Sequence, residues 1–374
     1  VFEKNEHPGG MLRYGIPSYK LEKDVLDAEI DVAKEMGVEI KTGIEVGKDV
    51  TIQQLRKQGY QAFYIAIGCS AGSLPDIKNI NSQGVMTAID YLHESNCGDT
   101  PFDGKVVVVG GGNVAIDASR VSSRNKANQV HQFCLEQEVD MPASNEEIRE
   151  AREDGVTIHC GWGPQEIIET NGKVSAIVFK KCVSVFNDEG KFAPVYDENT
   201  TVTVDCERVI FAIGQRSVWG DLLKGSKVEF GRGNGAVADA LTYQTAEPDI
   251  FVGGDVYTGP KFAIDAIAQG KIAAESLHRY VHHGHMETGR NRWEFKPLDT
   301  DDILVESYDR GPKQVEGINS KVTDKFKDNV LALTEEQIKK ETSRCLGCGA
   351  TIVDANKCIG CGICTTKCDF DAIK

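Results

Sequence analysis

Six cysteines near the end of the chain have the types and spacing of iron–sulfur ligands. They lie in the stretch RCLGCGATIVDANKCIGCGICTTKC, residues 344–368. Four of them follow the ferredoxin spacing C-x2-C-x2-C-x3-C, with Asp369 where proline is usual, and these four are Cys358, Cys361, Cys364 and Cys368. This spacing brings successive thiolates to adjacent corners of one cubane, and the glycines between them permit the necessary turns. The run therefore predicts a 4Fe–4S cluster, which carries single electrons.

Cys345 and Cys348 precede this run and leave the number of clusters open. In two-cluster ferredoxins the fourth cysteine of such a run serves the other cluster. Two cubanes need about eight thiolates at four per cluster, and six are present here, so either one cluster has spare cysteines beside it or the missing ligands lie outside this chain. The alternative is a zinc ribbon, with Cys345, Cys348, Cys358 and Cys361 as ligands. Zinc would leave the last two cysteines without a role, and the iron–sulfur interpretation is favoured.

A nucleotide-binding motif lies in the middle of the chain, in KVVVVGGGNVAIDASR at residues 105–120. The apolar run is typical of a buried parallel strand, and a helical pattern follows the glycines. The first glycine allows a tight turn, the third lets a pyrophosphate approach the backbone, and the alanine lets the helix pack closely on the strand. N–H groups at the helix start attract the phosphates. The predicted nucleotide-binding residues of this turn are Gly110, Gly112, Asn113, Val114 and Ala115.

The acidic residue after the next strand indicates which nicotinamide nucleotide is bound. The strand QVHQFCLE ends at Glu136, about twenty residues beyond the turn, where a carboxylate accepts hydrogen bonds from the ribose hydroxyls. The same charge repels the 2′-phosphate of NADPH. Arg120 and Arg124, on the intervening helix, are the nearby cations that could offset this repulsion. The site is therefore predicted to favour NAD(H) over NADP(H).

With these motifs, the sequence resembles the small subunit of glutamate synthase and its flavoprotein relatives, which include the large subunit of NAD(P)H–ferredoxin transhydrogenase. The resemblance extends from residue 1 to about residue 285. It rests on VFEKNEHPGGMLRYGIPSYKL, GGGNVAIDASR, EVDMPAS, VIFAIGQR and DIFVGGDVYTGPKFAIDAIAQGKIAAESL. It implies an α/β fold with two Rossmann-like dinucleotide-binding domains, FAD on one and the nicotinamide nucleotide on a second domain inserted within it. A small ferredoxin-like iron–sulfur domain would follow.

The resemblance also implies which residues contact the flavin. Glu3 matches the acidic residue that holds the FAD ribose, and Asp255 matches the carboxylate on the ribityl chain. The helix starting near Ala263 would point its N-terminus at the flavin, where the helix dipole stabilises the anionic reduced ring. The family pattern further implies Gly10, Leu12, Val46, Gly68 and Gly254 on the flavin side, and Gly214 on the return crossing beside the nicotinamide nucleotide.

The chain departs from the family pattern in three ways. No GxGxxG fingerprint for FAD precedes Glu3, and Val1 falls inside an expected strand, so we expect the chain to be a fragment whose beginning is absent. Leu135-Glu136-Gln137 stands where NADPH-using relatives carry paired arginines, which again favours NADH. The cluster cysteines follow the flavin domain, whereas the glutamate synthase subunit carries them ahead of it. This order is similar to that of flavoproteins in anaerobic electron-transfer complexes, some of which bifurcate electrons.

Length and composition indicate a soluble protein of several domains. The 374 residues are enough for roughly two or three compact units. The net charge of −15 argues against nucleic-acid binding, and the sequence has neither an apolar run long enough for a membrane span nor a signal peptide at its start. The expected divisions are an FAD-binding first part at 1–102, an inserted NAD(H)-binding domain at 103–216, an FAD-binding second part at 217–285, a linker at 286–333 and a ferredoxin-like domain at 334–374.

Several local patterns complete the expected organisation. GVTIHCGWGPQEII, GKVSAIVFKKCVSVF and TVTVDCERVIFAIG predict strands of a small antiparallel layer within the insert. LTEEQIKKETSR predicts a short helix capped by Thr334, with Gln337 three residues later. Thiolates kept reduced for metal binding indicate a reducing compartment, the cytoplasm. The other cysteines are interpreted as small apolar residues, scattered singly at Cys69, Cys97, Cys134, Cys160, Cys182 and Cys206.

Together these features predict an NADH-dependent subunit that passes electrons between NAD(H), FAD and the 4Fe–4S cluster within a multi-subunit complex, with ferredoxin or another subunit as partner. Flavin takes up two electrons and releases them singly, and hydride transfer needs geometry rather than acid–base chemistry, so no catalytic residue is assigned. One alternative is the NADPH-oxidising small subunit of glutamate synthase beside a glutamine-hydrolysing large subunit. Another is a scaffold subunit without turnover. A disulfide reductase would need a redox-active cysteine pair beside the flavin, which the sequence does not show.

Overall fold

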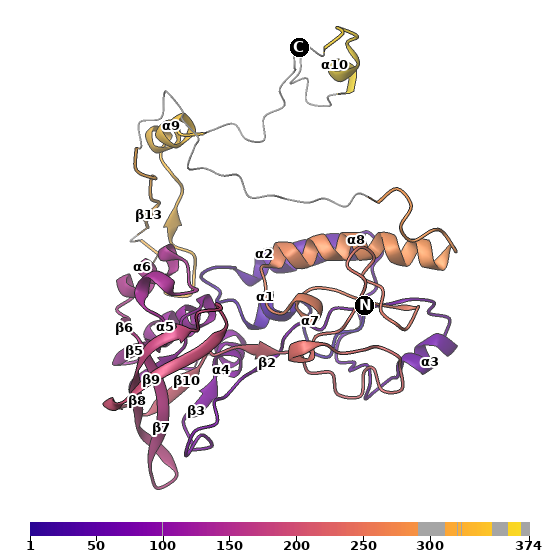
Figure 1. The fold of residues 1–374 in the computed structure, drawn as a ribbon. Coiled ribbons are helices and arrows are strands. Elements are labelled where there is room, and N and C mark those ends of the chain that lie inside the picture. The colour runs from indigo at the N-terminus through magenta and orange to yellow at the C-terminus, as the bar shows by residue number, and fades with distance from the viewer. Residues whose placement is uncertain (99, 291–310, 320, 323, 346–357, 368–374) are drawn as a thin grey trace. The chain divides into compact units, whose positions relative to one another are not determined.

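The computed structural model describes residues 1–98, 100–290, 311–319, 321–322, 324–345 and 358–367 (Figure 1). The chain divides into two compact units. The first comprises residues 1–294 and 322–328, and the second comprises residues 295–321 and 329–374. Within the described ranges, no helix has both the length and the apolar character needed to cross a lipid bilayer.

A five-stranded parallel sheet, here called the nucleotide sheet, carries the glycine turn (Figure 1). Its strands, in spatial order, are β3 (Val85–Thr87), β10 (Arg208–Phe211), β4 (Lys105–Val109), β5 (Gln129–Cys134) and β6 (Thr157–Cys160). Because all five are parallel, their carboxyl ends meet at one edge, which is where ligands bind in such sheets. The sheet includes β3, which lies before the domain boundary expected at residue 102. The pairing of β3 with β10 places that strand with the insert rather than with the first FAD-binding part.

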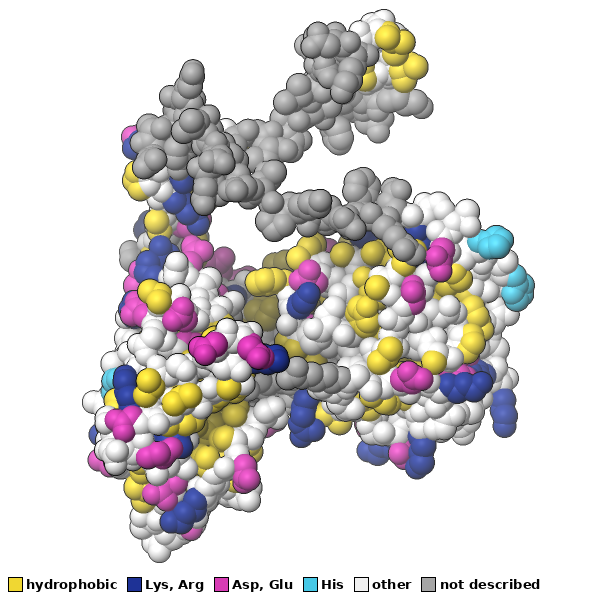
Figure 2. Space-filling view, in the orientation of Figure 1, with side chains coloured by type: hydrophobic (Ala, Val, Ile, Leu, Met, Phe, Trp, Pro, Cys, Tyr) yellow, Lys and Arg dark blue, Asp and Glu magenta, His cyan; other side chains and the backbone are white. Residues whose placement is uncertain are grey.

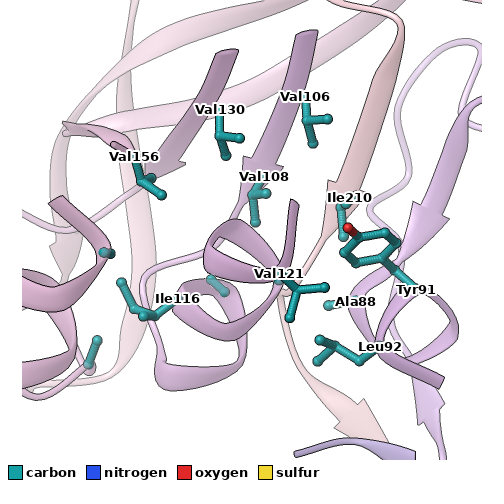
Figure 3. Close-up of a cluster of buried hydrophobic side chains, with 14 of the residues drawn as sticks. Ala88, Tyr91, Leu92, Val106, Val108, Ile116, Val121, Val130, Val156 and Ile210 are labelled. Carbon is teal, nitrogen blue, oxygen red and sulfur yellow. The ribbon is translucent and has the colours of Figure 1, made fainter. Parts of the chain in front are cut away.

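The valine run of β4 is buried on both faces because protein covers each side of the nucleotide sheet. Val106 and Val108 pack with residues of α4 (Ala88–Cys97) and α5 (Asn113–Arg124) in the cluster drawn in Figure 3. Val107 and Val109 belong to a separate cluster on the opposite face. All four valines are at most 2% exposed. This two-sided burial explains the unbroken apolar run of β4, because a half-exposed strand would alternate apolar and polar residues.

A three-stranded antiparallel sheet packs against the second face through Ile167, Ile177 and Phe179. Its strands are β7 (Trp162–Thr170), β8 (Lys173–Phe186) and β9 (Phe192–Asp205), with β8 in the middle. The expectation that TIHC and RVIF belong to this layer was wrong, because these residues form β6 and β10 of the nucleotide sheet. An apolar strand pattern predicts extended backbone but does not specify which strand it pairs with.

The remainder of the first unit holds the predicted flavin-side residues and is centred on two paired strands. β1 (Phe63–Ile65) pairs in parallel with β12 (Ile250–Val252), so the two expected FAD-binding parts are joined by backbone hydrogen bonds. Ile52 and Leu55 pack in the same core. The helices of this part are α1 (Gly10–Tyr14), α2 (Lys23–Glu35), α3 (Ile52–Lys57), α7 (Asp255–Thr258) and α8 (Ala263–Val281), with a short 3-10 helix at Arg232–Asn234.

Apolar side chains are exposed on α8 and at the end of α2. Ile264 is 67% exposed and Ile267 is 53% exposed, while Met36, just after α2, is 82% exposed. Figure 2 shows yellow hydrophobic side chains over this part of the surface. Exposed apolar surface of this kind is typical of places where a ligand or further protein packs.

The second unit begins its described part with two short strands. β13 (Gly317–Ile318) pairs antiparallel with β14 (Val330–Leu331). Helix α9 (Glu335–Ser343) follows, and α10 (Ile363–Lys367) lies among the cluster cysteines. Thr334 and Gln337 form a reciprocal capping box, which confirms the predicted start of this helix.

The stretch 286–333, expected to be a linker, is partly structured. It contains β13 and β14, and its residues 322–328 belong to the first unit. Phe326 packs against the core of α4, α5 and the nucleotide sheet. The backbone oxygen of Lys325 accepts a hydrogen bond from Arg124. An apolar contact and a backbone contact therefore fix this segment on the first unit, although its composition is polar.

Candidate functional site

The glycine turn leaves the helix start of α5 open for an anion. Gly110 has φ +148°, and a Cβ at this position would strike the carbonyl oxygen of Ala212, so only glycine fits. Gly112 is the N-cap of α5, and within the described chain nothing lies within 4 Å of a Cβ added there. As the N-cap, Gly112 has no side chain to cap the helix start, and an anion such as a pyrophosphate suits that end of the helix in charge and geometry.

The first residues of α5 anchor this turn. Ala115 is fully buried in the core beneath the nucleotide sheet, and Val114 packs beside it. Asn113 accepts a hydrogen bond through Oδ1 from the backbone N–H of Ser144 at 3.1 Å. The MPAS stretch, which the sequence shares with the resembled family, therefore holds the helix start in place.

Glu136 lies against the glycine turn. Its Oε2 is 2.6 Å from the position that a Cβ on Gly111 would occupy, so the carboxylate rests on the bare backbone of that glycine. The side chain is half-buried and follows the end of β5. This arrangement brings the predicted ribose acceptor to the predicted pyrophosphate turn, as binding of one dinucleotide requires.

Arg120 and Arg124 are engaged away from this carboxylate. Their Nε atoms donate to Asp154 Oδ2 at 2.8 and 3.0 Å, and Arg120 also pairs with Glu150. Both guanidinium groups stack on the ring of Tyr19, at 4.8 and 4.0 Å from its centroid. Because both cations already have partners, neither is placed to receive a 2′-phosphate.

The nucleotide helix is joined to the YGIPSYKL stretch by partly buried charged side chains that the sequence did not predict. Lys20 Nζ lies 2.5 Å from both Asp117 Oδ1 and Glu147 Oε1. Burial raises the pKa of Asp117 to about 6, although the charge of Lys20 acts in the opposite direction. Through Lys20, the YGIPSYKL stretch before α2 therefore attaches the flavin side to α5.

Sequence reasoning also missed Lys181, whose Nζ lies over the ring of Trp162 at 4.9 Å from its centroid and beside Gly161, a backbone partner of Glu136. The N–H of Gly161 donates to the backbone oxygen of Glu136 at 2.9 Å. A Cβ on Gly161 would lie 2.9 Å from Lys181 Nζ and 2.7 Å from Gln137 Nε2. Lys181 comes from the middle of β8, and no local pattern connects it with the end of β5. A test of nucleotide preference therefore has to include Lys181 as a candidate cation for the 2′-phosphate of NADPH.

The second glycine motif forms a sharp turn before α7. Gly254 has φ +70°, and its N–H donates to Gln269 Oε1 at 2.7 Å. Asp255 is half-buried, and its burial raises the pKa of the carboxyl. Its Oδ1 accepts a hydrogen bond from the N–H of Lys261 at 3.2 Å. A carboxylate held in this way keeps acceptor capacity for the hydroxyls of a ribityl chain.

Helix α8 begins at Ala263 with an uncapped N-terminus. Its N-cap residue, Phe262, has no side chain that can accept from the first N–H groups. The helix is 19 residues long, so its aligned peptide dipoles favour negative charge at this end. A reduced flavin ring carries such charge, and the uncapped donors therefore fit the predicted cofactor.

The flavin-side residues predicted near the beginning of the chain lie on short elements. Glu3 is half-buried, and its Oε1 accepts from the N–H of Asn5 at 2.8 Å. Gly10 has φ +51° and opens α1, which contains Leu12. Val46 packs on the core around β1 and β12. These positions are compatible with the roles that the resemblance implies, which remain predictions.

Gly68 and Gly214 lie where the chain crosses between the flavin side and the nucleotide side. Both have positive φ, +66° and +127°. The strands that follow them, β2 (Ala71–Gly72) and β11 (Gln215–Arg216), pair antiparallel. The outgoing and returning crossings therefore run side by side, which brings these two predicted residues to the same joint.

The cluster cysteines are only partly described. Cys345, Cys358, Cys361 and Cys364 are exposed, while Cys348 and Cys368 lie outside the described residues. Gly360 and Gly362 have φ of +69° and +71°, the conformations expected of a tight ligand loop. Among the residues that the structure describes, no three Cys, His, Asp or Glu side chains gather into a metal site. The ligand set therefore remains a prediction.

Two family models match the chain. The model described as pyridine nucleotide-disulphide oxidoreductase matches residues 4–270, and the model described as 4Fe-4S binding domain matches residues 351–374. Together they confirm the predicted cofactor classes, which are FAD, a nicotinamide nucleotide and a 4Fe–4S cluster. The second match covers the four-cysteine run and supports iron–sulfur rather than zinc.

Three relatives show the range of proteins similar to this chain. The beta subunit of NADP(+)-dependent formate dehydrogenase of Moorella thermoacetica is 35% identical over 76% of this chain and 40% of its own length. The subunit PreT of NAD-dependent dihydropyrimidine dehydrogenase of Escherichia coli O157:H7 is 32% identical over 75% and 62%. The small chain of NADPH glutamate synthase of Escherichia coli K12 is 32% identical over 75% and 63%. The chain thus spans less than two thirds of each relative, and all three are named as parts of larger enzymes.

A solved structure supports the fold. FprA of Mycobacterium tuberculosis in complex with NADPH superposes with a TM-score of 0.62 at 16% identity, over 75% of this chain and 77% of that chain. At this identity the likeness shows the fold alone. With the first family match, it confirms the predicted α/β class with Rossmann-like dinucleotide-binding domains.

Proposed function

Because the chain belongs to the pyridine nucleotide-disulphide oxidoreductase family, we propose that it is an NADH-dependent oxidoreductase subunit that passes electrons between NAD(H), FAD and a 4Fe–4S cluster. The observation that carries the proposal is that one compact unit contains both an acidic nucleotide site at Glu136 and an uncapped helix start at Ala263. The same chain continues into a 4Fe–4S segment.

The preference for NADH rests on the surroundings of Glu136. Its carboxylate is positioned for ribose hydroxyls, and the two arginines of α5 are held by Asp154 and Tyr19. The relatives are named as NAD- and NADP-dependent enzymes alike, so similarity does not decide the nucleotide. The local charges favour NADH.

Each proposed residue binds or orients rather than reacts. The backbone of Gly110 to Gly112 holds the pyrophosphate, and Glu136 orients the adenosine ribose. Asp255 holds the ribityl hydroxyls, and the start of α8 stabilises negative charge on the ring. A bound flavin supplies the conversion between two-electron and one-electron transfer. The thiolates of the four-cysteine run from Cys358 to Cys368 hold the cluster.

The proposed partners are other subunits of an electron-transfer complex or a ferredoxin-like carrier. The relatives named as subunits support an assembly. The exposure of Cys358, Cys361 and Cys364 supports access of a partner to the cluster. Thiolates of this kind persist in a reducing compartment, and we place the protein in the cytoplasm.

Anaerobic reduction of the purified full chain tests the proposal. NADH and NADPH are added separately while flavin absorbance and the EPR signal of the reduced cluster are followed. Rapid bleaching by NADH with a cluster signal is the expected result. Equal or faster bleaching by NADPH would overturn the preference, and loss of that activity in Lys181→Met would identify Lys181 as the ligand of the 2′-phosphate. Flavin bleaching without a cluster signal would contradict the proposed path to the cluster.

A further inference from the structure

Two cysteines that are far apart in the sequence face each other at the edge of the nucleotide sheet. Cys134 and Cys160 are the last residues of β5 and β6, and they are directly paired in the register of these strands. Their Sγ atoms lie 3.8 Å apart. Cys134 is buried, whereas Cys160 is partly exposed and contacts Met141 Sδ at 3.9 Å. The two thiols therefore form a pair with one accessible member.

This pair lies directly behind the nucleotide turn. The Cβ of Cys134 is 3.2 Å from the position that a Cβ on Gly111 would occupy, so the two residues are in contact. The Sγ of Cys134 is 3.7 Å from the backbone oxygen of Glu136, two residues further along the chain. A movement of Cys134 would therefore act on the glycine turn at Gly111 and on the backbone of Glu136, the predicted ribose acceptor.

We propose that a peroxide oxidises Cys134 and Cys160 to a disulfide and that this cross-link weakens the binding of the nicotinamide nucleotide. In the first step the sulfur of Cys160 takes one peroxide oxygen, the O–O bond breaks, and one water leaves. The resulting sulfenic acid is attacked by the thiol of Cys134, so that an S–S bond forms, the S–O bond breaks and a second water leaves. The two thiols lose two electrons and two protons in total, and the peroxide is reduced to two waters.

The geometry permits this bond with a small local movement. Neighbouring strands lie about 4.8 Å apart, which is within the range of roughly 4.4–6.8 Å for the Cα atoms of a disulfide. The sulfurs must approach to about 2.05 Å. Both residues end their strands and β6 is the edge strand of the sheet, so the backbone can adjust there without disturbing the centre. Burial raises the pKa of both thiols, so oxidation should be slow near neutral pH and faster in alkaline solution.

This pair is separate from the flavin side, where Cys69 contacts the backbone of Asp255. Formation of the disulfide does not depend on the proposed function. Only its effect on nucleotide binding rests on the nucleotide site at Glu136. The two parts of the inference therefore need separate measurements.

The first measurement detects the bond itself. The purified full chain, carrying its flavin and cluster, is treated with hydrogen peroxide, alkylated and digested with trypsin. The peptides 127–149 and 153–173 contain one cysteine each, so a cross-linked species of these two peptides identifies the pair against any disulfides among the cluster cysteines. Failure to find this species, including at alkaline pH, would overturn the proposal.

The second measurement follows NAD⁺ binding by calorimetry, because NAD⁺ does not reduce oxidised flavin. Loss of one charge-assisted hydrogen bond at Glu136 predicts that peroxide raises the Kd by roughly 10- to 150-fold. Dithiothreitol should restore the original value. Cys160→Ser should make binding insensitive to peroxide, whereas Cys206→Ser, which keeps the pair, should behave as wild type. Peroxide acts on the iron–sulfur cluster of all variants alike. The comparison between Cys160→Ser and Cys206→Ser therefore isolates the effect of the Cys134–Cys160 pair on NAD⁺ binding. A cross-linked protein with an unchanged Kd would refute the effect on binding, and failure of untreated protein to bind NAD⁺ would instead count against the proposed function.

Discussion

Replacing Glu136 with alanine is expected to weaken NADH binding far more than NADPH binding. The carboxylate lies against the glycine turn, with Oε2 at 2.6 Å from the position that a Cβ on Gly111 would occupy. The adenosine ribose of a bound dinucleotide is expected beside this carboxylate. A hydrogen bond to a charged group contributes about 1.5–3 kcal/mol, so losing one such bond raises the Kd for NADH by roughly 10- to 150-fold. NADPH loses no such bond, because the carboxylate repels its 2′-phosphate, and its binding should be unchanged or improved.

Stopped-flow reduction of the flavin under anaerobic conditions measures this change at increasing concentrations of each nucleotide. Glu138→Ala is a matched control, because Glu138 is exposed and pairs with Arg152 at 2.8 Å rather than with the turn. The control should bind both nucleotides as the wild type does. An unchanged Kd for NADH in Glu136→Ala, or a parallel loss for NADPH, would refute the assignment of this residue as the selector.

Three further changes test other parts of the site. Gly110→Ala combines a disfavoured φ of +148° with a clash against the carbonyl of Ala212; NADH should fail to reduce the flavin while dithionite still does, and normal reduction by NADH would contradict the turn. Burial raises the pKa of Asp117 from 3.8 to about 6, so the folded state binds an extra proton and stability falls as pH rises through this window. Asp117→Asn should therefore remove up to ~3 kcal/mol of this pH dependence, measured as the difference in the free energy of unfolding between about pH 4 and a pH above 6, and an unaltered profile would exclude Asp117 as its source. Cys361→Ser should abolish the EPR signal of the cluster while NADH still bleaches the flavin, and a retained signal would exclude Cys361 as a ligand.

Local patterns were sufficient for much of the fold. The valine run before Gly110 predicted a strand buried on both faces, and Thr334 with Gln337 predicted the capping box of α9. The spacing of the four-cysteine run predicted the 4Fe–4S segment that the family match confirms. Each pattern lies within one continuous stretch, where chain geometry alone relates residue spacing to conformation.

Sheet membership was harder to predict. TIHC and RVIF have the same apolar character as the strands of the antiparallel layer, yet both pair within the nucleotide sheet. Burial on a sheet selects the same residue types whichever partner strand is present. The composition of the polar stretch before residue 333 did not show which of its residues contact the core of the first unit, and the structure identifies Phe326 as one of them.

The sequence by itself determined the chemistry available to this protein: a glycine turn with a following carboxylate, a second glycine motif before a helix, and a run of cluster cysteines. Only the tertiary structure decided which side chains surround that chemistry. It placed Lys181 beside Gly161, whose N–H donates to the backbone of Glu136. It engaged Arg120 and Arg124 with Asp154 and brought the Sγ atoms of Cys134 and Cys160 to 3.8 Å. The physical reason is that spacing along the chain fixes contacts within a turn, whereas contacts between strands depend on pairing and register, to which the whole sheet contributes.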